Sequence, residues 1–123
     1  MRVFVTGAAG FIGSNLTDRL LSSGNYVVGY DNFSTGQLKF LDKALKNPNF
    51  KLVTGDILHK NKMIKAIKNS ELVFHLSANA DIKDGLNNPH VDLEQNTIGT
   101  FNVLEAMRYN NIKKIVFSST GSV

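Results

Sequence analysis

The 123-residue sequence contains no cysteine and only two prolines. Without cysteine there are no disulfides, no thiolate metal ligands and no cysteine nucleophile. Long apolar runs are also missing, because glycines break up the N-terminal stretch MRVFVTGAAGFIG. That stretch is too short for the core of a signal peptide or for a membrane span, so we expect a cytoplasmic location. At 42% hydrophobic and 20% charged residues, the composition excludes a disordered or collagen-like chain.

A strong charge of one sign is lacking as well, since the formal net charge is +4. The lysines concentrate in LKFLDKALK and HKNKMIKAIK, where they alternate with apolar residues at helical spacing. That pattern is typical of solvated helix faces. A nucleic-acid surface requires clustered basic residues with aromatic side chains for stacking, and neither is present, so we expect no nucleic-acid partner. An anionic small ligand is compatible with the mild positive charge.

What the sequence does contain is an alternation of strand-like and helix-like segments. Short β-rich runs occupy residues 2–6, 26–31, 50–56, 72–76 and 113–119. Between them, helical periodicity covers residues 11–23, 37–46, 60–69 and 91–109, the last with Leu93, Thr97, Phe101, Leu104 and Met107 along one face. Strands that are apolar on both faces indicate a parallel sheet covered on both sides. We therefore predict one α/β domain, a doubly wound Rossmann-type parallel sheet in three α/β/α layers.

Three glycines follow the first predicted strand at a fixed spacing. Gly7, Gly10 and Gly13 form G-x-x-G-x-x-G and open the first predicted helix. Glycines at these points allow a tight turn, a close approach of a pyrophosphate and close packing of the helix, whose N-terminus attracts anions. The alternative interpretation is a glycine-rich turn that binds no ligand. A P-loop is excluded, because no Gly-Lys-Ser/Thr sequence follows.

An acidic residue follows at the distance that dinucleotide binding requires. Asp31 ends the second predicted strand, where a carboxylate accepts hydrogen bonds from ribose hydroxyls and repels a 2′-phosphate. The alternative is a turn or helix-capping aspartate. Asp56 follows the third predicted strand, where the adenine edge would lie, with Ile57 beside it. Together these residues predict a site for NAD rather than NADP.

The sequence contains six motifs in the order TGAAGFIG, YDNFSTG, GDI, HLSANAD, NTIGTFNVLEA and FSSTGSV. In this order the chain resembles the extended short-chain dehydrogenases/reductases, in particular the nucleotide-sugar epimerases of the UDP-glucose 4-epimerase type. The resemblance covers the whole chain. It implies that residues 1–123 hold the first five strands of an NAD(P)-binding domain, C-terminally truncated, with the sugar-nucleotide domain absent.

The resemblance also implies roles for particular residues, which we group by the part of NAD that each would contact. The pyrophosphate would lie against Gly7, Gly10, Phe11, Ile12 and Gly13. The adenosine ribose would be held by Asp31, Asn32, Ser34, Thr35 and Gly36, and the adenine by Asp56 and Ile57. The nicotinamide end would be bordered by Leu76, Ser77, Ala78, Asn96 and Ser118. For Asn96, a buried helix asparagine bonded to nearby backbone is an equal alternative. Thr120 would be the catalytic hydroxyl.

The implied chemistry is transient oxidation of a sugar such as that of UDP-glucose or UDP-galactose. In the family a tyrosine phenolate, assisted by a lysine in Tyr-x-x-x-Lys, removes the proton of the 4-hydroxyl while hydride passes to NAD⁺. Hydride then returns to the other face of the 4-keto sugar. The family's pair follows the serine-threonine cluster, whereas Tyr109 and Lys113 precede it and lie at the wrong end of the sheet. We therefore interpret Tyr109 as packing material and Lys113 as surface charge.

Several interpretations of function stay open at this point. The 123-residue chain is expected to be inactive alone, since it lacks the Tyr-x-x-x-Lys pair. Gly121 and Ser122 stand where related dehydratases and decarboxylases carry acidic residues, which favours an epimerase or a plain reductase. A stand-alone NAD-binding module is the other alternative. We expect His75 to be a satisfied core residue, no metal site, and a possible homodimer through the helix at 91–109.

Overall fold

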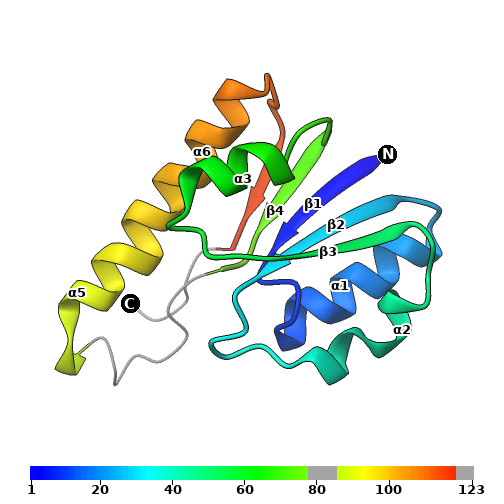
Figure 1. The fold of residues 1–123 in the computed structure, drawn as a ribbon, viewed down its shortest axis with the longest axis horizontal. Coiled ribbons are helices and arrows are strands. Elements are labelled where there is room, and N and C mark those ends of the chain that lie inside the picture. Colours follow the sequence, from blue (N-terminus) through cyan, green and yellow to red (C-terminus); the bar gives the residue numbers. More distant parts are fainter. Residues whose placement is uncertain (78–85, 119–123) are drawn as a thin grey trace.

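The computed structural model describes residues 1–77 and 86–118, which form one five-stranded sheet (Figure 1). The strands are β1 (Arg2–Thr6), β2 (Tyr26–Asp31), β3 (Phe50–Thr54), β4 (Leu72–His75) and β5 (Ile115–Phe117). Their order is β3-β2-β1-β4-β5, and every neighbouring pair is parallel. The strand order reverses between β1 and β4, which is where doubly wound folds bind their ligands. The predicted Rossmann-type fold is confirmed.

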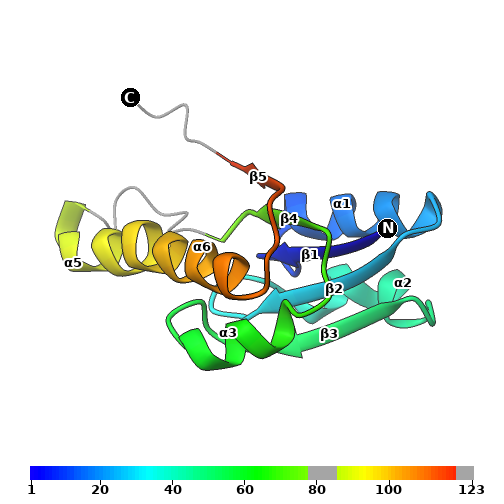
Figure 2. The ribbon, with the colours of Figure 1, turned by 90° about the horizontal axis from the view of Figure 1, so that it is seen from above.

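Helices cover both faces of this sheet. They are α1 (Phe11–Ser22), the 3₁₀ helix η1 (Leu38–Leu41), α2 (Asp42–Leu45), α3 (Lys60–Ala66), α5 (Pro89–Asp92), the π-helical segment η2 (Leu93–Ile98) and α6 (Gly99–Tyr109). Figures 1 and 2 show α1 and α2 on one face and α3 and α6 together on the other. The three-layer α/β/α arrangement follows from strands that bury apolar side chains in both directions.

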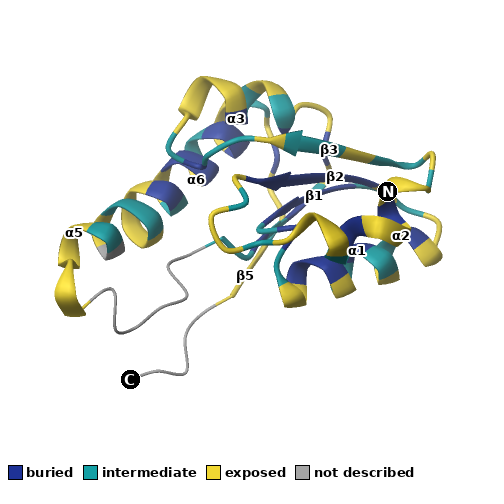
Figure 3. Cartoon of the chain, turned by 60° about the horizontal axis from the view of Figure 1, so that its bottom comes forward, coloured by how far each residue is buried: buried dark blue, intermediate teal, exposed yellow. Residues whose placement is uncertain are grey.

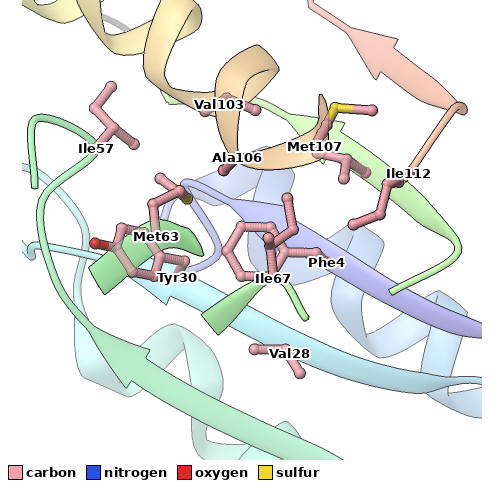
Figure 4. Packing of buried hydrophobic residues seen from close by; sticks show 11 residues of the cluster. Phe4, Val28, Tyr30, Ile57, Met63, Ile67, Val103, Ala106, Met107 and Ile112 are labelled. Atoms are coloured by element: carbon pink, nitrogen blue, oxygen red, sulfur yellow. The ribbon is translucent and has the colours of Figure 1, made fainter. Parts of the chain in front are cut away.

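The alternation of side chains along the strands divides the core into two clusters. Phe4 of β1 faces α3 and α6, where it packs with Val28 and Tyr30 of β2 (Figure 4). Val3 and Val5, its neighbours on β1, face α1 and α2 instead. Figure 3 shows this double burial of β1 and β2, the two strands whose carboxyl ends carry the glycine loop and Asp31. The central strands are therefore held from both sides, which fixes the position of their ends.

Two predicted helices differ from their sequence patterns. The segment predicted as a helix over 37–46 begins as a 3₁₀ turn, and Leu38 and Leu45 of its stripe are exposed. The helix predicted over 91–109 is interrupted by the π-helical segment, and Leu93, Phe101 and Leu104 point away from the core. Of the predicted face only Met107 is buried, and it shares its buried stripe with Gly99, Asn102, Val103 and Ala106. Both patterns predicted a helix correctly, but they predicted the buried face poorly.

Candidate functional site

A pocket of about 300 Å³ lies at the carboxyl edge of the sheet. It receives residues from the loop after β1, the ends of β2 and β4, the loop after β3, the π-helical segment and the end of β5. Most of the residues predicted to bind a cofactor line it: Gly7, Gly10, Phe11, Ile12, Gly13, Asp31, Asn32, Ser34, Thr35, Gly36, Ile57, Leu76, Ser77 and Ser118. Segments far apart in the sequence thus meet at one edge, as parallel strands require.

The glycine loop wraps tightly between β1 and α1. Gly7 has φ of +71°, a left-handed conformation that favours glycine, and its N–H donates to the Tyr30 carbonyl at 2.9 Å. A Cβ on Gly13 would lie 2.0 Å from the Gly7 carbonyl oxygen, so no side chain fits between the helix and the loop. The loop and the first turn of α1 therefore form one compact unit.

The N-terminus of α1 is open toward the pocket. Gly10 occupies the N-cap, no side chain caps the helix, and the first turn has no acidic residue. Phe11 and Ile12, which begin the helix, are 73% and 70% exposed although they are apolar. The first-turn N–H groups of a helix lack intrahelical partners and carry partial positive charge. This end of α1 is thus suited to an anion such as a phosphate.

Asp31 lies beside the glycine loop, lines the pocket and is 8% exposed. Its Oδ2 accepts the Ala9 N–H at 2.9 Å, and its Oδ1 accepts the Phe33 N–H at 2.7 Å. Each carboxylate oxygen has a second lone pair, so both retain acceptor capacity for hydroxyl groups. The backbone bonds fix the orientation of the carboxylate. Asp31 is therefore more than a turn aspartate, because it joins two loops that line the pocket.

Asp56 is not among the residues that line the pocket, but it is hydrogen-bonded to its wall. Its Oδ1 accepts the Leu58 N–H at 2.9 Å, its Oδ2 accepts the Asn32 amide at 3.3 Å, and its carbonyl accepts the Tyr30 hydroxyl at 2.7 Å. Burial, together with the charge of Asp56, raises the pKa of Tyr30 to about 12. Asp56 thus holds the loop that presents Ile57, which does line the pocket.

Three lining residues were missed by the sequence reasoning: Tyr30, Gly55 and Gln95. Tyr30 and Gly55 directly precede the predicted Asp31 and Asp56. Their position at the ends of strands could therefore have indicated that they line the pocket. Gln95 lines the pocket, whereas the predicted Asn96 does not. Both lie in the π-helical segment, and Asn96 was expected at the site from the resemblance alone. Ala78 and Thr120 lie outside the described residues.

His75 ends β4 next to the pocket and is completely buried. Its Nδ1 lies 2.7 Å from Thr6 Oγ1 and its Nε2 lies 2.9 Å from Thr100 Oγ1. Burial lowers the pKa of His75 to about 4, so the ring is neutral at neutral pH. The prediction of a satisfied core histidine is confirmed. Among residues 1–77 and 86–118, no group of three or more His, Asp or Glu side chains could hold a metal ion.

The prediction that Tyr109 packs in the core is wrong. Tyr109 is 72% exposed at the end of α6 and does not pack in the core as expected. The buried residues near it are Ala106, Met107 and Ile112, which take the inward positions of that turn. Lys113 is exposed, as predicted. No helix in the described part of the chain is long and apolar enough to cross a membrane.

Comparison with known proteins gives consistent matches over nearly the whole chain. It is 40% identical to a UDP-glucose 4-epimerase of Mycolicibacterium smegmatis over 98% of its own length and 39% of the relative's. A UDP-N-acetyl-alpha-D-glucosaminuronate decarboxylase of Bacillus cytotoxicus is 35% identical, with coverage of 99% and 37%. The crystal structure of Thermus thermophilus UDP-glucose 4-epimerase in complex with NAD superposes with a TM-score of 0.88 at 36% identity, covering 98% and 38%.

The chain therefore spans about two fifths of the length of these relatives. Residues 3–123 match the family described as the NAD dependent epimerase/dehydratase family. NAD is thus the cofactor of the family, and the glycine loop, the open end of α1 and Asp31 occupy one pocket in this chain. The chain belongs to the NAD-dependent epimerase/dehydratase family.

Proposed function

We propose that this chain binds NAD in the pocket at the carboxyl edge of its sheet, as the cofactor-binding part of a nucleotide-sugar epimerase of the UDP-glucose 4-epimerase type. The observation that carries the proposal is the presence of an uncapped helix N-terminus and a fixed carboxylate in one pocket. The first is suited to a pyrophosphate and the second to a ribose. The anionic pyrophosphate thus has a partially positive partner, and the ribose hydroxyls have a hydrogen-bond acceptor.

The residues present fit NAD at the adenosine end. A Cβ on Gly7 would lie 3.1 Å from the Ser77 nitrogen, and a Cβ on Gly13 would collide with Gly7. There is therefore no room for a side chain at either position, and the backbone of the loop stays accessible. A pyrophosphate approaches such a loop closely. Among the described residues that line the pocket there is no lysine or arginine to pair with a 2′-phosphate, while Asp31 would repel one. The site therefore favours NAD over NADP.

At the opposite end, Leu76, Ser77 and Ser118 would border the nicotinamide. Ser118 is held by the His75 carbonyl, which accepts both its N–H and its hydroxyl at 3.3 Å. The chemistry that bound NAD would supply here is reversible hydride transfer with the sugar C4. We propose Thr120, two residues beyond Ser118, as the hydroxyl that hydrogen-bonds to the reacting sugar oxygen. The proton transfers require a Tyr-x-x-x-Lys pair, so we propose that residues 1–123 alone do not epimerise.

The relatives include both epimerases and decarboxylases, so the reaction of the whole protein is also a proposal. We favour epimerisation because Gly121 and Ser122 provide no acid or base after Thr120. By the resemblance, related decarboxylases carry a glutamate two residues after this threonine, at the position of Ser122. The proposed substrates are UDP-glucose and UDP-galactose. A cytoplasmic location, expected from the sequence, stays a prediction.

Calorimetry with NAD and NADP tests the cofactor proposal. The purified chain is expected to bind NAD with a stoichiometry of about one and NADP at least about tenfold more weakly, because Asp31 opposes the extra phosphate. Asp42→Asn, which removes a carboxylate on the exposed surface of α2, is the control for a general effect of protein charge. It leaves the preference unchanged. A folded chain that binds neither nucleotide, or that prefers NADP, would contradict the proposal.

We also propose that α6 and the π-helical segment before it form a homodimer interface with a second copy of the chain. Leu93, Ile98, Phe101 and Leu104 are all at least 40% exposed, whereas the opposite side of α6 packs on the sheet. An exposed apolar helix stripe is a feature of protein interfaces. Light scattering across a concentration series is expected to show a dimer that Phe101→Glu dissociates. A monomer at every concentration would contradict this assignment.

A further inference from the structure

A chain of hydrogen bonds runs from the inside of the sheet to the nicotinamide end of the pocket. The Thr6 hydroxyl, at the end of β1, accepts the N–H groups of Leu76 at 3.0 Å and Ser77 at 3.1 Å. Leu76 and Ser77 both line the pocket. Thr6 is completely buried, so the N–H groups that it binds cannot exchange this partner for water without opening the site.

The Thr6 oxygen determines the protonation state of His75. A hydroxyl has two lone pairs and one hydrogen, and the two backbone N–H groups occupy both lone pairs. The remaining contact, 2.7 Å from His75 Nδ1, must therefore use the hydroxyl hydrogen. His75 Nδ1 is then an acceptor and Nε2 carries the proton, which it donates to Thr100 Oγ1 at 2.9 Å. The geometry selects one neutral tautomer.

The His75 ring also connects to β5. It stacks on Phe117 with ring centroids 5.5 Å apart, and the His75 carbonyl holds the backbone of Ser118. One side chain thus touches β1, α6 and β5, and the segments that it fixes through Thr6 and its own carbonyl are those on which Leu76, Ser77 and Ser118 lie.

We propose that His75, held in its Nε2–H tautomer, is a positioning residue that orients Leu76 and Ser77 toward the cofactor through the Thr6 hydroxyl. The inference rests on the proposed function, since NAD is the group against which these residues would be oriented. His75 itself makes no contact with the pocket, and its effect is indirect. Protonation of Nδ1 would point a hydrogen at an oxygen that has no lone pair left. A charged His75 is therefore incompatible with the bound arrangement.

The first experiment is independent of NAD. In ¹⁵N NMR of histidine-labelled chain, the His75 signals, assigned by their loss in His75→Asn, are expected to show a protonated Nε2 and an unprotonated Nδ1 at pH 7. His59 is exposed and serves as the internal reference for a solvent-facing ring. Protonation at Nδ1 would overturn the inference.

The second experiment measures NAD affinity. Thr6→Val removes the acceptor of both N–H groups and is expected to weaken NAD binding at least about tenfold, while Thr6→Ser restores it. The matched control is Thr17→Val, because Thr17 is equally buried on α1 and its hydroxyl has no hydrogen-bond partner in the described part of the chain. Its affinity for NAD is expected to stay within about threefold of the wild type.

His75 is then tested directly. His75→Phe is expected to weaken binding about tenfold, whereas His75→Asn, whose amide oxygen accepts near the position of Nδ1, retains most of the affinity. Because His75 acts through Thr6, the Thr6→Val/His75→Phe double variant binds NAD no more weakly than Thr6→Val alone.

Three outcomes separate the possibilities. Folded Thr6→Val or His75→Phe that binds NAD like the wild type, with only a lower free energy of unfolding, would show a purely structural role and overturn the inference. Additive losses in the double variant would overturn it too. A folded wild-type chain that binds no NAD would instead overturn the proposed function and the positioning role with it, whereas the tautomer would still be measured by NMR.

Discussion

Gly13→Ala tests the contact between the glycine loop and α1. The added Cβ would lie 2.0 Å from the Gly7 carbonyl oxygen, 2.8 Å from the Gly7 carbonyl carbon and 3.0 Å from Ala8 Cα. All three are backbone atoms, so no side chain can rotate away, and α1 must move from the loop by about 1 Å or more. Overpacking costs about 1–3 kcal/mol, and a clash with backbone belongs at the upper end of that range.

The same movement reorients the N–H groups at the start of α1. Hydrogen bonds to a charged group contribute about 1.5–3 kcal/mol each, so losing one weakens NAD binding by roughly 10- to 100-fold. Urea unfolding and calorimetry measure the two effects on one sample. The matched control is Gly24→Ala at the other end of α1, where φ is +87° and a Cβ meets nothing within 4 Å. It costs about 1–2 kcal/mol of backbone strain and leaves NAD affinity unchanged.

Gly13→Ala with wild-type NAD affinity would refute this reasoning. So would an equal loss of affinity in Gly24→Ala, because the loss would then follow from lower stability and not from the geometry of the loop.

Three further predictions concern ionisable groups. Asp31→Ala leaves two backbone N–H groups without their acceptor, so it is expected to lower the free energy of unfolding by about 2 kcal/mol and to abolish measurable NAD binding, as followed by urea unfolding and calorimetry. Burial raises the pKa of Tyr30 to about 12, so a spectrophotometric titration is expected to show one tyrosine that ionises near pH 12; a titration with no such late step would contradict the burial of Tyr30. His75 has a pKa of about 4 when folded and about 6.5 when unfolded, so its contribution to stability is complete above pH 6.5 and is lost as pH falls toward 4, by about 3 kcal/mol at most. Urea unfolding between pH 7 and pH 4 measures this loss, and His75→Asn is expected to reduce it.

The sequence was most informative where one local pattern implies one geometry. The strands β1 and β2 have the predicted bounds, since each is a short β-rich run that ends at turn-forming residues. The glycine spacing and Asp31 indicated the pocket because both follow strands, and the ends of parallel strands meet at one edge. For these residues, local sequence and topology together determine position.

Prediction was poorer where tertiary contacts decide between similar residues. The resemblance implied Asn96 at the nicotinamide end, whereas its neighbour Gln95 lines the pocket, and both lie in a π-helical segment. Asp56 and Ile57 are neighbours, yet Ile57 lines the pocket, whereas the Asp56 carboxylate accepts hydrogen bonds from Asn32 and Leu58 and is not among the lining residues. The bonding of His75 to Thr6 and Thr100 joins residues 69 and 25 positions away, which no local pattern reports.

The most direct test of the central claim locates NAD on the molecule by ¹H–¹⁵N NMR. On titration with NAD, the largest amide shifts are expected in residues 7–13, 31–36 and 76–77, the segments that line the pocket. The exposed face of α3, on the other side of the sheet from α1, is expected to remain unchanged. Unchanged spectra at saturating NAD, or shifts confined to residues outside the pocket, would contradict the assignment of this edge of the sheet as the NAD site.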